Sequence, residues 1–239
     1  MKPHWYVAIL KRLPDNIVSY ASKKLLNYYI NKNANIRIRG IEKIENVKRP
    51  ILFICNHLSN SDGIVLNRVL KDEDVTFVAG IKLSKDEFTN MGMYAAKTLS
   101  IKPNSADKDA ISSIIKTLKD GHNVFIFPEG TRSRTGSMIE AKKGITLIQR
   151  LSKATLIPVG IWGSEKLLPI SDTSMANETF AHADVNVTFG DEIQFPERFE
   201  GEAKHVYEDR ILTYAMQAIA KLLPEKYRGF YSENKQAAE

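Results

Sequence analysis

Short apolar segments recur along this chain, and their pattern predicts which of them form strands. A continuous apolar run bounded by polar or turn residues is typical of a strand buried on both faces. Residues 51–55, with the sequence ILFIC, are the clearest such run. On the same grounds, strands are expected at residues 36–39, 75–79, 99–102, 124–127 and 155–162. At residues 185–189 apolar and polar positions alternate, which is typical of an edge or half-exposed strand.

Between these segments, apolar residues recur at the three- and four-residue spacing of helices. Residues 107–119 show this spacing most clearly, and further helices are expected at residues 61–71, 84–96, 140–152 and 205–223. Because strands and helices alternate, the sequence predicts an α/β fold with a mostly parallel central sheet flanked by helices. A polar tail is expected at residues 232–239.

The N-terminus has a different pattern. Residues 4–31 read as two helices separated near Pro14, which stops the first and is followed by an N-cap signal. Apolar and aromatic side chains fall near one face of the second helix, namely Ile17, Tyr20, Ala21, Leu25 and Tyr28. We therefore expect an N-terminal amphipathic helix pair over residues 1–33 and a main domain over residues 34–239.

The positive charge of the chain is concentrated at this end. Residues 1–50 contain 11 Lys and Arg against 3 Asp and Glu, which is +8, whereas the whole chain carries +6. No apolar stretch approaches the roughly 18–20 residues of a membrane-spanning helix, and no secretory signal pattern is present. The single cysteine, Cys55, excludes an intrachain disulfide and is typical of a reducing compartment.

A candidate catalytic pair follows the strand at residues 51–55, in the sequence NHLSNSD of residues 56–62. His57 can accept a proton from a hydroxyl, and Asp62 can fix its tautomer and stabilise the imidazolium. If a helix begins near Ser59–Ser61, one of these residues caps it and the loop folds His57 back onto Asp62. The spacing alone also allows a loop histidine beside an unrelated acid in the first helical turn.

A second polar cluster, FPEGTRSR at residues 127–134, follows the strand expected at residues 124–127. In parallel sheets, sites gather beyond the carboxyl ends of strands, where both clusters lie. Gly130 permits close backbone approach, Arg132 can bind an anion through two hydrogen bonds, and Glu129 adds a carboxylate. The cluster is therefore a candidate phosphate cradle. The alternative interpretation is a solvated turn that carries charges.

Together, NHLSNSD and FPEGTRS resemble the glycerolipid acyltransferase family, which includes the 1-acylglycerol-3-phosphate acyltransferases. The family's first motif is Asn-His-x4-Asp and its third is Phe-Pro-Glu-Gly-Thr-Arg-Ser, and both are present unchanged, about 70 residues apart. Residues 80–83 resemble the start of the second motif, and residues 156–161 resemble the apolar fourth motif. One departure is that the second motif commonly ends in arginine, where this chain has Lys102, and lysine does not reproduce a guanidinium fork.

The resemblance, which covers roughly residues 36–190, implies an enzyme, a 1-acylglycerol-3-phosphate O-acyltransferase. Such an enzyme moves a fatty acyl chain from an acyl-CoA or acyl carrier protein thioester to the free sn-2 hydroxyl of its acceptor, giving phosphatidic acid in phospholipid biosynthesis. A different lysolipid or a glycerol-phosphate acceptor stays open, as does a non-catalytic lipid-binding relative. No cofactor and no metal are implied beyond the thioester co-substrate.

The resemblance also implies roles for individual residues. His57 is the general base, and Asp62 orients it. Arg132, with one of two lysines, holds the phosphate of the acceptor, and Glu129 binds the acceptor or orients Arg132. The expected substrate-binding residues are Lys82, Lys102, Glu129, Gly130, Thr131 and Arg132. Backbone amides near Gly130 are candidates for binding the oxyanion.

Because the acceptor and product of such an enzyme are lipids, we expect it to dock on a bilayer. The basic and aromatic residues 1–33 suit an anionic membrane surface, where each basic group contributes about 1 kcal/mol. The expected location is therefore the cytoplasmic face of the membrane, peripheral or monotopic. The alternative is that these helices pack on the sheet as ordinary core helices. A positive surface would also attract an acidic acyl carrier protein.

Other chemistries find less support in the sequence. A cysteine that ends an apolar strand, as Cys55 does, is usually a small core residue and not a nucleophile. No G-x-S-x-G elbow of a serine hydrolase appears, and no further ligands join His57 and Asp62 in a metal-binding set. No nucleic-acid partner is expected, because the basic N-terminus is accompanied by no nucleic-acid-binding motif.

Overall fold

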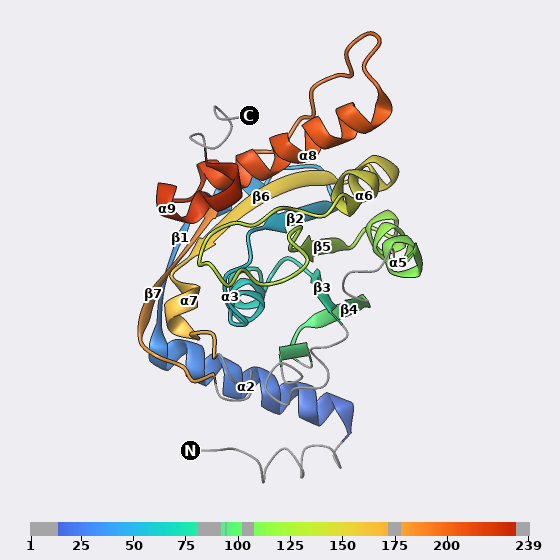
Figure 1. The fold of residues 1–239 in the computed structure, drawn as a ribbon. Helices are drawn as coiled ribbons and strands as arrows, with labels where there is room; N and C mark the ends of the chain where they lie inside the picture. The colour runs from blue at the N-terminus through green and yellow to red at the C-terminus, as the bar shows by residue number, and fades with distance from the viewer. Residues whose placement is uncertain (1–13, 81–91, 94, 102–107, 172–177, 233–239) are drawn as a thin grey trace.

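Seven strands form one sheet in the computed structural model, which describes residues 14–80, 92, 93, 95–101, 108–171 and 178–232. Their order across the sheet is β1-β7-β6-β2-β5-β3-β4 (Figure 1). Neighbouring strands are parallel except for β6 and β7, so β1 and β7 run opposite to the other five. The expected α/β fold with a mostly parallel sheet is confirmed. The strands are β1 (Ala34–Arg39), β2 (Ile51–Cys55), β3 (Val75–Gly80), β4 (Lys97–Ile101), β5 (Asn123–Ile126), β6 (Thr155–Trp162) and β7 (Ala183–Phe189).

Helices cover both faces of this sheet (Figure 1). One face packs against α5 (Lys108–Lys119), α6 (Gly144–Ser152) and α8 (Lys204–Lys221). The other packs against α2 (Asp15–Asn33), α3 (Asp62–Val69) and α7 (Ser164–Leu167). The shorter elements are η1 (Ile41–Ile44), α9 (Glu225–Arg228) and η4 (Gly229–Tyr231).

The central strand β2 is buried along its whole length. Leu52 and Ile54 point to the core that contains α5, α6 and α8, while Ile51, Phe53 and Cys55 point to the opposite core, and all five are 0% exposed. Burying such an apolar side chain stabilises the fold by about 1.5–3 kcal/mol. The continuous apolar run is therefore explained by two covered faces, and it fixes β2 firmly in the middle of the sheet.

The pairing of β2 with β5 brings the two polar clusters together. Leu52 lies opposite Val124, and Ile54 lies opposite Ile126, in parallel register. The loops that follow the two strands therefore leave the same edge of the sheet side by side. Two motifs that are about 70 residues apart in sequence become neighbours for this reason.

Residues 185–189 were expected in an edge or half-exposed strand, and the half-exposed alternative is confirmed. Val185, Val187 and Phe189 are buried while Asn186 and Thr188 are only partly covered. β7 is not an edge strand, because it lies between β1 and β6. Incomplete cover on one face leaves the same alternation as an edge position. The first N-terminal helix, most of the expected helix at residues 84–96 and the tail from residue 233 lie outside the described residues.

Helix α2 has one buried face and one exposed face. The buried face consists of Val18, Ser22, Leu26 and Ile30, at four-residue spacing. The opposite face is exposed and contains Ile17, Tyr20, Lys24 and Tyr28. Ile17, Tyr20 and Tyr28 were expected on the apolar face, and they do share a face, but it is the one turned away from the core. No helix within the described residues is both long and apolar enough to span a membrane.

The C-terminal segment is fastened to the loop that precedes α6. Met138 N donates to Tyr227 O at 2.9 Å, and Phe230 N donates to Met138 O at 3.0 Å. Gly229 sits between these bonds with φ +51°, and a Cβ there would lie 2.1 Å from Met138 O. Only glycine allows this approach, since such a distance is far inside van der Waals contact.

We predict that Gly229→Ala lowers the free energy of unfolding by about 2–4 kcal/mol, because the new methyl group forces the C-terminal segment away from Met138. The matched control is Gly121→Ala, since Gly121 also has positive φ, +93°, but a Cβ there meets nothing within 4 Å. The control should lose only about 1 kcal/mol in its free energy of unfolding, which is the cost of backbone strain alone. Urea unfolding of both variants tests this, and equal losses would contradict it.

Candidate active site

Two side chains hold the ring of His57 at the carboxyl edge of the sheet. Its Nδ1 lies 2.8 Å from Asp62 Oδ2, and its ring stacks on Phe127 with 4.2 Å between ring centroids. The side chain is 18% exposed, so it is not sealed in the core. Because a carboxylate oxygen accepts, the bond assigns the proton of a neutral imidazole to Nδ1. Nε2 then carries the lone pair that a general base needs.

Asp62 opens α3, and its Oδ2 also accepts hydrogen bonds from Leu58 N at 2.7 Å and Ser59 N at 2.9 Å. The carboxylate is 0% exposed, so these bonds fold the loop tightly around it. The expectation that Ser59, Asn60 or Ser61 caps the helix is corrected here. Ser61 occupies the N-cap position without a side-chain capping bond, because the carboxylate of Asp62 reaches back to the loop amides instead.

The other side chains of this loop fix its path. Asn56 exchanges two hydrogen bonds with Ile161, donating to its carbonyl at 2.8 Å and accepting from its amide at 2.9 Å. This side-chain amide continues the ladder between β2 and β6 by one further step. Ser59 Oγ donates to Leu168 O at 3.0 Å, so the loop is also tied to the residue after α7. Its geometry therefore depends on β6 and α7 as well as on β2.

Glu129 joins the two clusters. Its Oε1 accepts from His57 N at 3.1 Å, and its Oε2 accepts from Ile139 N at 3.1 Å. Ser133 N returns a bond to His57 O at 2.8 Å, so the backbone of His57 is held on both sides by residues 129–133. Burial raises the pKa of Glu129 to about 8, with a further rise from the nearby Asp62 charge that its two amide bonds oppose.

The hydrogen-bond partners of Glu129 differ from the one considered from the sequence, which was Arg132. It is 0% exposed, and the hydrogen bonds it makes within the described residues go to backbone amides. Arg132, which Glu129 was considered to orient, instead places Nη1 2.6 Å from Glu178 Oε1. No sequence signal pointed to Glu178, since it lies outside both motifs.

The glycine turn after β5 is closed by a hydrogen bond within the turn itself. Gly130 has φ +71°, and its amide donates to Phe127 O at 3.0 Å. That amide is therefore already used within the turn and is not free to bind an oxyanion. Thr131 and Gly130 are exposed at the tip of the turn, next to the partly buried Arg132.

The structure thus brings most of the predicted site residues together. His57, Asp62 and Glu129 form one connected network, and Gly130, Thr131 and Arg132 follow in the adjoining turn. Lys82 and Lys102 lie outside the described residues.

Two other chemistries considered from the sequence were tested against the structure. Cys55 is fully buried, and burial raises the pKa of its thiol well above the usual value, so the reactive thiolate is disfavoured there. Within the described ranges, no group of three or more His, Cys, Asp or Glu side chains is placed to hold a metal ion.

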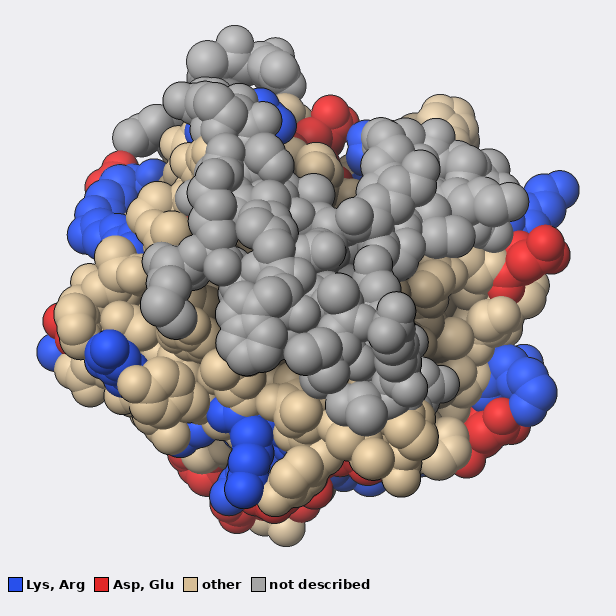
Figure 2. Space-filling model, turned by 90° about the horizontal axis from the view of Figure 1, so that it is seen from below, with Lys and Arg blue, Asp and Glu red and all other residues tan. Residues whose placement is uncertain are grey.

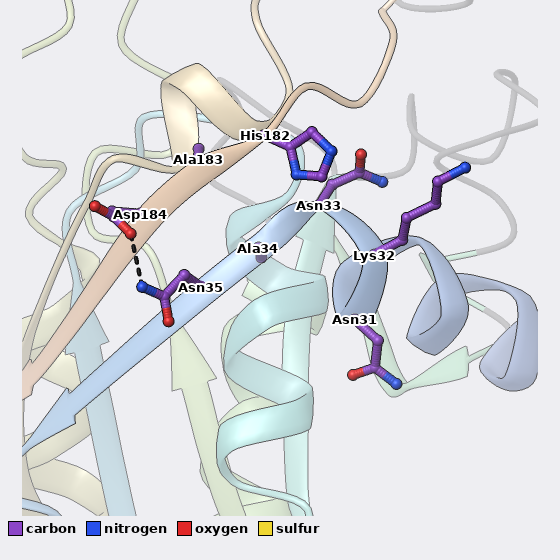
Figure 3. A pocket seen from close by; sticks show the side chains of 8 residues that line it. All are labelled: Asn31, Lys32, Asn33, Ala34, Asn35, His182, Ala183 and Asp184. Carbon is purple, nitrogen blue, oxygen red and sulfur yellow. Dashed lines mark hydrogen bonds between the residues drawn. The ribbon is translucent and has the colours of Figure 1, made fainter.

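A polar hollow of about 470 Å³ lies elsewhere, at the junction of α2 with the starts of β1 and β7 (Figure 3). Asn35 donates to Asp184 across it at 2.8 Å, and the His182 side chain lies near Asn33 at its rim. Because β1 and β7 run opposite to the other strands, their starts share the sheet edge where β2 and β5 end. The hollow contains none of the residues of the two motifs.

The family described as Acyltransferase matches residues 35–162, a range that includes both motifs. A chloroplastic 1-acyl-sn-glycerol-3-phosphate acyltransferase of Arabidopsis thaliana is 27% identical over 152 residues, 64% of this chain and 42% of that protein. A second chloroplastic one, of Brassica napus, is 24% identical over 184 residues, covering 77% and 52% of the two chains. That of Saccharomyces cerevisiae is 28% identical over 140 residues, covering 56% and 45%. The chain spans about half the length of these relatives.

The fold also has a solved counterpart. The 1-acyl-sn-glycerophosphate acyltransferase PlsC from Thermotoga maritima superposes with a TM-score of 0.57 and 20% identity, covering 87% of this chain and 79% of that one. At this identity the likeness establishes the fold.

The buried carboxyl of Glu129 predicts a specific pH dependence of stability. In the unfolded chain it loses its proton near pH 4.5, and in the folded chain near pH 8. Between these values the folded state binds more protons, so the free energy of unfolding falls as the pH rises, by roughly 5 kcal/mol from this group. Above about pH 8 the loss is complete.

We predict that Glu129→Gln removes this fall. The variant should be less stable than the wild type at pH 5, because its amide group cannot accept from both His57 N and Ile139 N, and the difference should shrink or reverse by pH 8.5. Urea unfolding from pH 5 to pH 8.5 measures it. Glu202→Gln is the control, because its ion pair with Arg210 lowers the pKa of Glu202 instead of raising it. A constant difference between wild type and Glu129→Gln would contradict the prediction.

Proposed function

This chain belongs to the acyltransferase family, and from that premise we propose that it acylates 1-acylglycerol-3-phosphate to give phosphatidic acid. The donor in this proposal is an acyl thioester of coenzyme A or acyl carrier protein. The observation that carries the proposal is the bond between His57 Nδ1 and Asp62, which directs the basic nitrogen of a partly exposed imidazole away from the carboxylate. The names of the curated relatives support the choice of acceptor.

In the proposed reaction, His57 Nε2 accepts the proton of the acceptor's free hydroxyl as that oxygen attacks the thioester carbonyl. A C–O bond forms, the C–S bond breaks, and the proton passes from the imidazolium to the leaving thiolate. Asp62 stabilises the imidazolium between these steps through its bond to Nδ1. No covalent acyl-enzyme is needed, and the buried Cys55 takes no part.

Glu129 acts as a positioning residue in this proposal. Through its bond to His57 N it fixes the backbone from which the base projects. A raised pKa suits this role, since a neutral carboxyl adds no charge next to the Asp62 carboxylate. Phe127 contributes in the same way, because the stacked ring prevents the imidazole from turning off Asp62.

Arg132 is proposed to hold the phosphate of the acceptor. It lies in the turn that also carries Ser133, whose amide donates to His57 O. A guanidinium binds phosphate through two parallel hydrogen bonds and thereby fixes the distance from the phosphate to the base. Lys82 and Lys102 are proposed as further contacts to the same phosphate, as the resemblance implies.

A membrane surface is proposed as the place of the reaction, and α2 as the docking element. Its exposed face presents Tyr20, Tyr28 and Ile17, which are 62%, 56% and 47% exposed. The Lys24 ammonium lies 5.0 Å from the centre of the Tyr20 ring, so a cation accompanies the aromatic stripe. On the side of the molecule that bears α2, the described surface is mostly uncharged, with Lys and Arg and some carboxylates toward its rim (Figure 2). This composition favours the interface of an anionic bilayer.

We predict that His57→Ala lowers the rate of acyl transfer by at least about 100-fold, the lower end of what a general base contributes. Purified protein is incubated with acyl-CoA or acyl carrier protein thioesters and a panel of lysolipids, and products are identified by mass spectrometry. His122→Ala is the matched control, because His122 also pairs with an aspartate, at 3.3 Å from Asp74, but is exposed at the opposite end of β5. Near-normal activity of His57→Ala would refute the mechanism.

Docking through α2 predicts that Tyr20→Ser with Tyr28→Ser reduces sedimentation with vesicles containing anionic lipid by about 10-fold or more. These substitutions leave the buried face of α2 intact, whereas deleting residues 1–33 would also remove Leu26 and Ile30 from the core. Tyr214→Ser is the control, because Tyr214 is 45% exposed on α8, on the other side of the sheet. Unchanged sedimentation of the double variant would refute docking by this face.

A further inference from the structure

Arg132 already holds a carboxylate in this structure. Glu178 Oε1 lies 2.6 Å from Arg132 Nη1, and Glu178 Oε2 accepts from Asn60 Nδ2 at 2.8 Å. The carboxylate is 0% exposed, and the arginine side chain is 13% exposed. Glu178 thus links the loop after β2 to the turn after β5, through a side chain that neither motif includes.

Glu178 is held in this place from its other side as well. Phe180 stacks on Tyr29 of α2, with 5.4 Å between centroids and 10° between ring planes. Ala181 N donates to Leu167 O at 2.9 Å, which ties the same segment to α7. The carboxylate therefore reaches Arg132 from a segment anchored on two helices, and the ion pair is not a chance surface contact.

A carboxylate and a phosphate bind a guanidinium through the same donors. A phosphomonoester carries a charge of about −1.5 to −2 at pH 7, so it and the Glu178 carboxylate repel each other at one arginine. Since the proposed function assigns the acceptor's phosphate to Arg132, the two anions compete for the same group.

We propose that Glu178 occupies the phosphate subsite while it is empty and that an incoming phosphate binds by displacing it from Arg132. This inference rests on the proposed function, and it adds a residue that sets the affinity of the acceptor site. An internal competitor lowers the affinity of every anion that uses Arg132 by one common factor. Free phosphate has no other contact that compensates for this loss of affinity, so it occupies the site less. A lysolipid also binds through its acyl chain, and the site therefore stays available for lipid acceptors.

The test is direct binding without an acyl donor, so that it does not depend on catalysis. Isothermal titration calorimetry with inorganic phosphate, and separately with glycerol 3-phosphate, compares the wild type with Glu178→Gln. We expect both ligands to bind the variant about 10-fold more tightly, a size typical of coupled binding, and by the same factor. Equal fold-changes in affinity indicate displacement, because each ligand must displace Glu178 at the same cost in binding free energy.

Glu202→Gln is the matched control, since it removes a carboxylate from another arginine ion pair, at 2.9 Å from Arg210, outside this site. Its phosphate affinity should equal that of the wild type. Unchanged or weaker phosphate binding by Glu178→Gln would overturn the proposal and make Glu178 a residue that positions Arg132. Clearly different factors for the two ligands would overturn displacement.

Removing Glu178 leaves Arg132 partly buried without its partner, so this variant can be too unstable to purify. Asn60→Ala then serves as the second variant, because it removes the bond to Glu178 Oε2 and leaves both charges in place. It should strengthen phosphate binding in the same direction by a smaller factor, and weaker binding would overturn the proposal. If phosphate binds as expected but no lysolipid is acylated, the proposed function fails while the role of Glu178 stands.

Discussion

The parallel pairing of β2 with β5 is the constraint on which the site depends. Each strand is short, and neither carries a reactive side chain, yet their register decides which loop residues meet. A shift of the pairing by one residue would turn every side chain of a strand to the opposite face. That shift is prevented by β2 itself, because both of its faces are completely buried and the Phe53 ring is fitted against Phe125 and Phe189. The precise placement of the site residues at the edge of the sheet therefore depends on apolar packing around β2 at its centre.

Around this frame, buried polar groups do the positioning. Asn56 takes the place of a strand residue against Ile161, Asp62 gathers two loop amides, and Glu129 receives one amide from each of two loops. Each group would be costly to bury alone, and each is buried with hydrogen-bond partners, which for Asp62 all lie at Oδ2. Removing one partner leaves another buried group unpaired, so the loops are stabilised as a unit and not bond by bond.

The sequence predicted the order of strands and helices and the pairing of His57 with Asp62 well, for two physical reasons. The apolar period reports directly which faces are buried, and His57 and Asp62 lie in one loop whose short length limits its shape. The motif identified Glu129 as a site residue. Its hydrogen bonds could not be predicted, because they come from backbone amides, which every residue type except proline has. Glu178 was not found, since its contact with Arg132 depends on how a distant segment packs on α2 and α7. The sequence of β7 left two arrangements open, an edge strand and a half-exposed one, because partial cover and an edge position leave the same alternation.

The reversed direction of β1 and β7 has a mechanical consequence. The last residue of α2, Asn33, is followed directly by the first residue of β1, Ala34, at the sheet edge from which the His57 loop departs. There is no linker between the helix and the strand to act as a swivel. If α2 lies in the plane of a bilayer, the sheet has a single tilt available to it, and the mouth of the site keeps a constant height above the lipid. Access to an acceptor would then be set by how far a lysolipid rises out of the bilayer, and not by rotation of the protein.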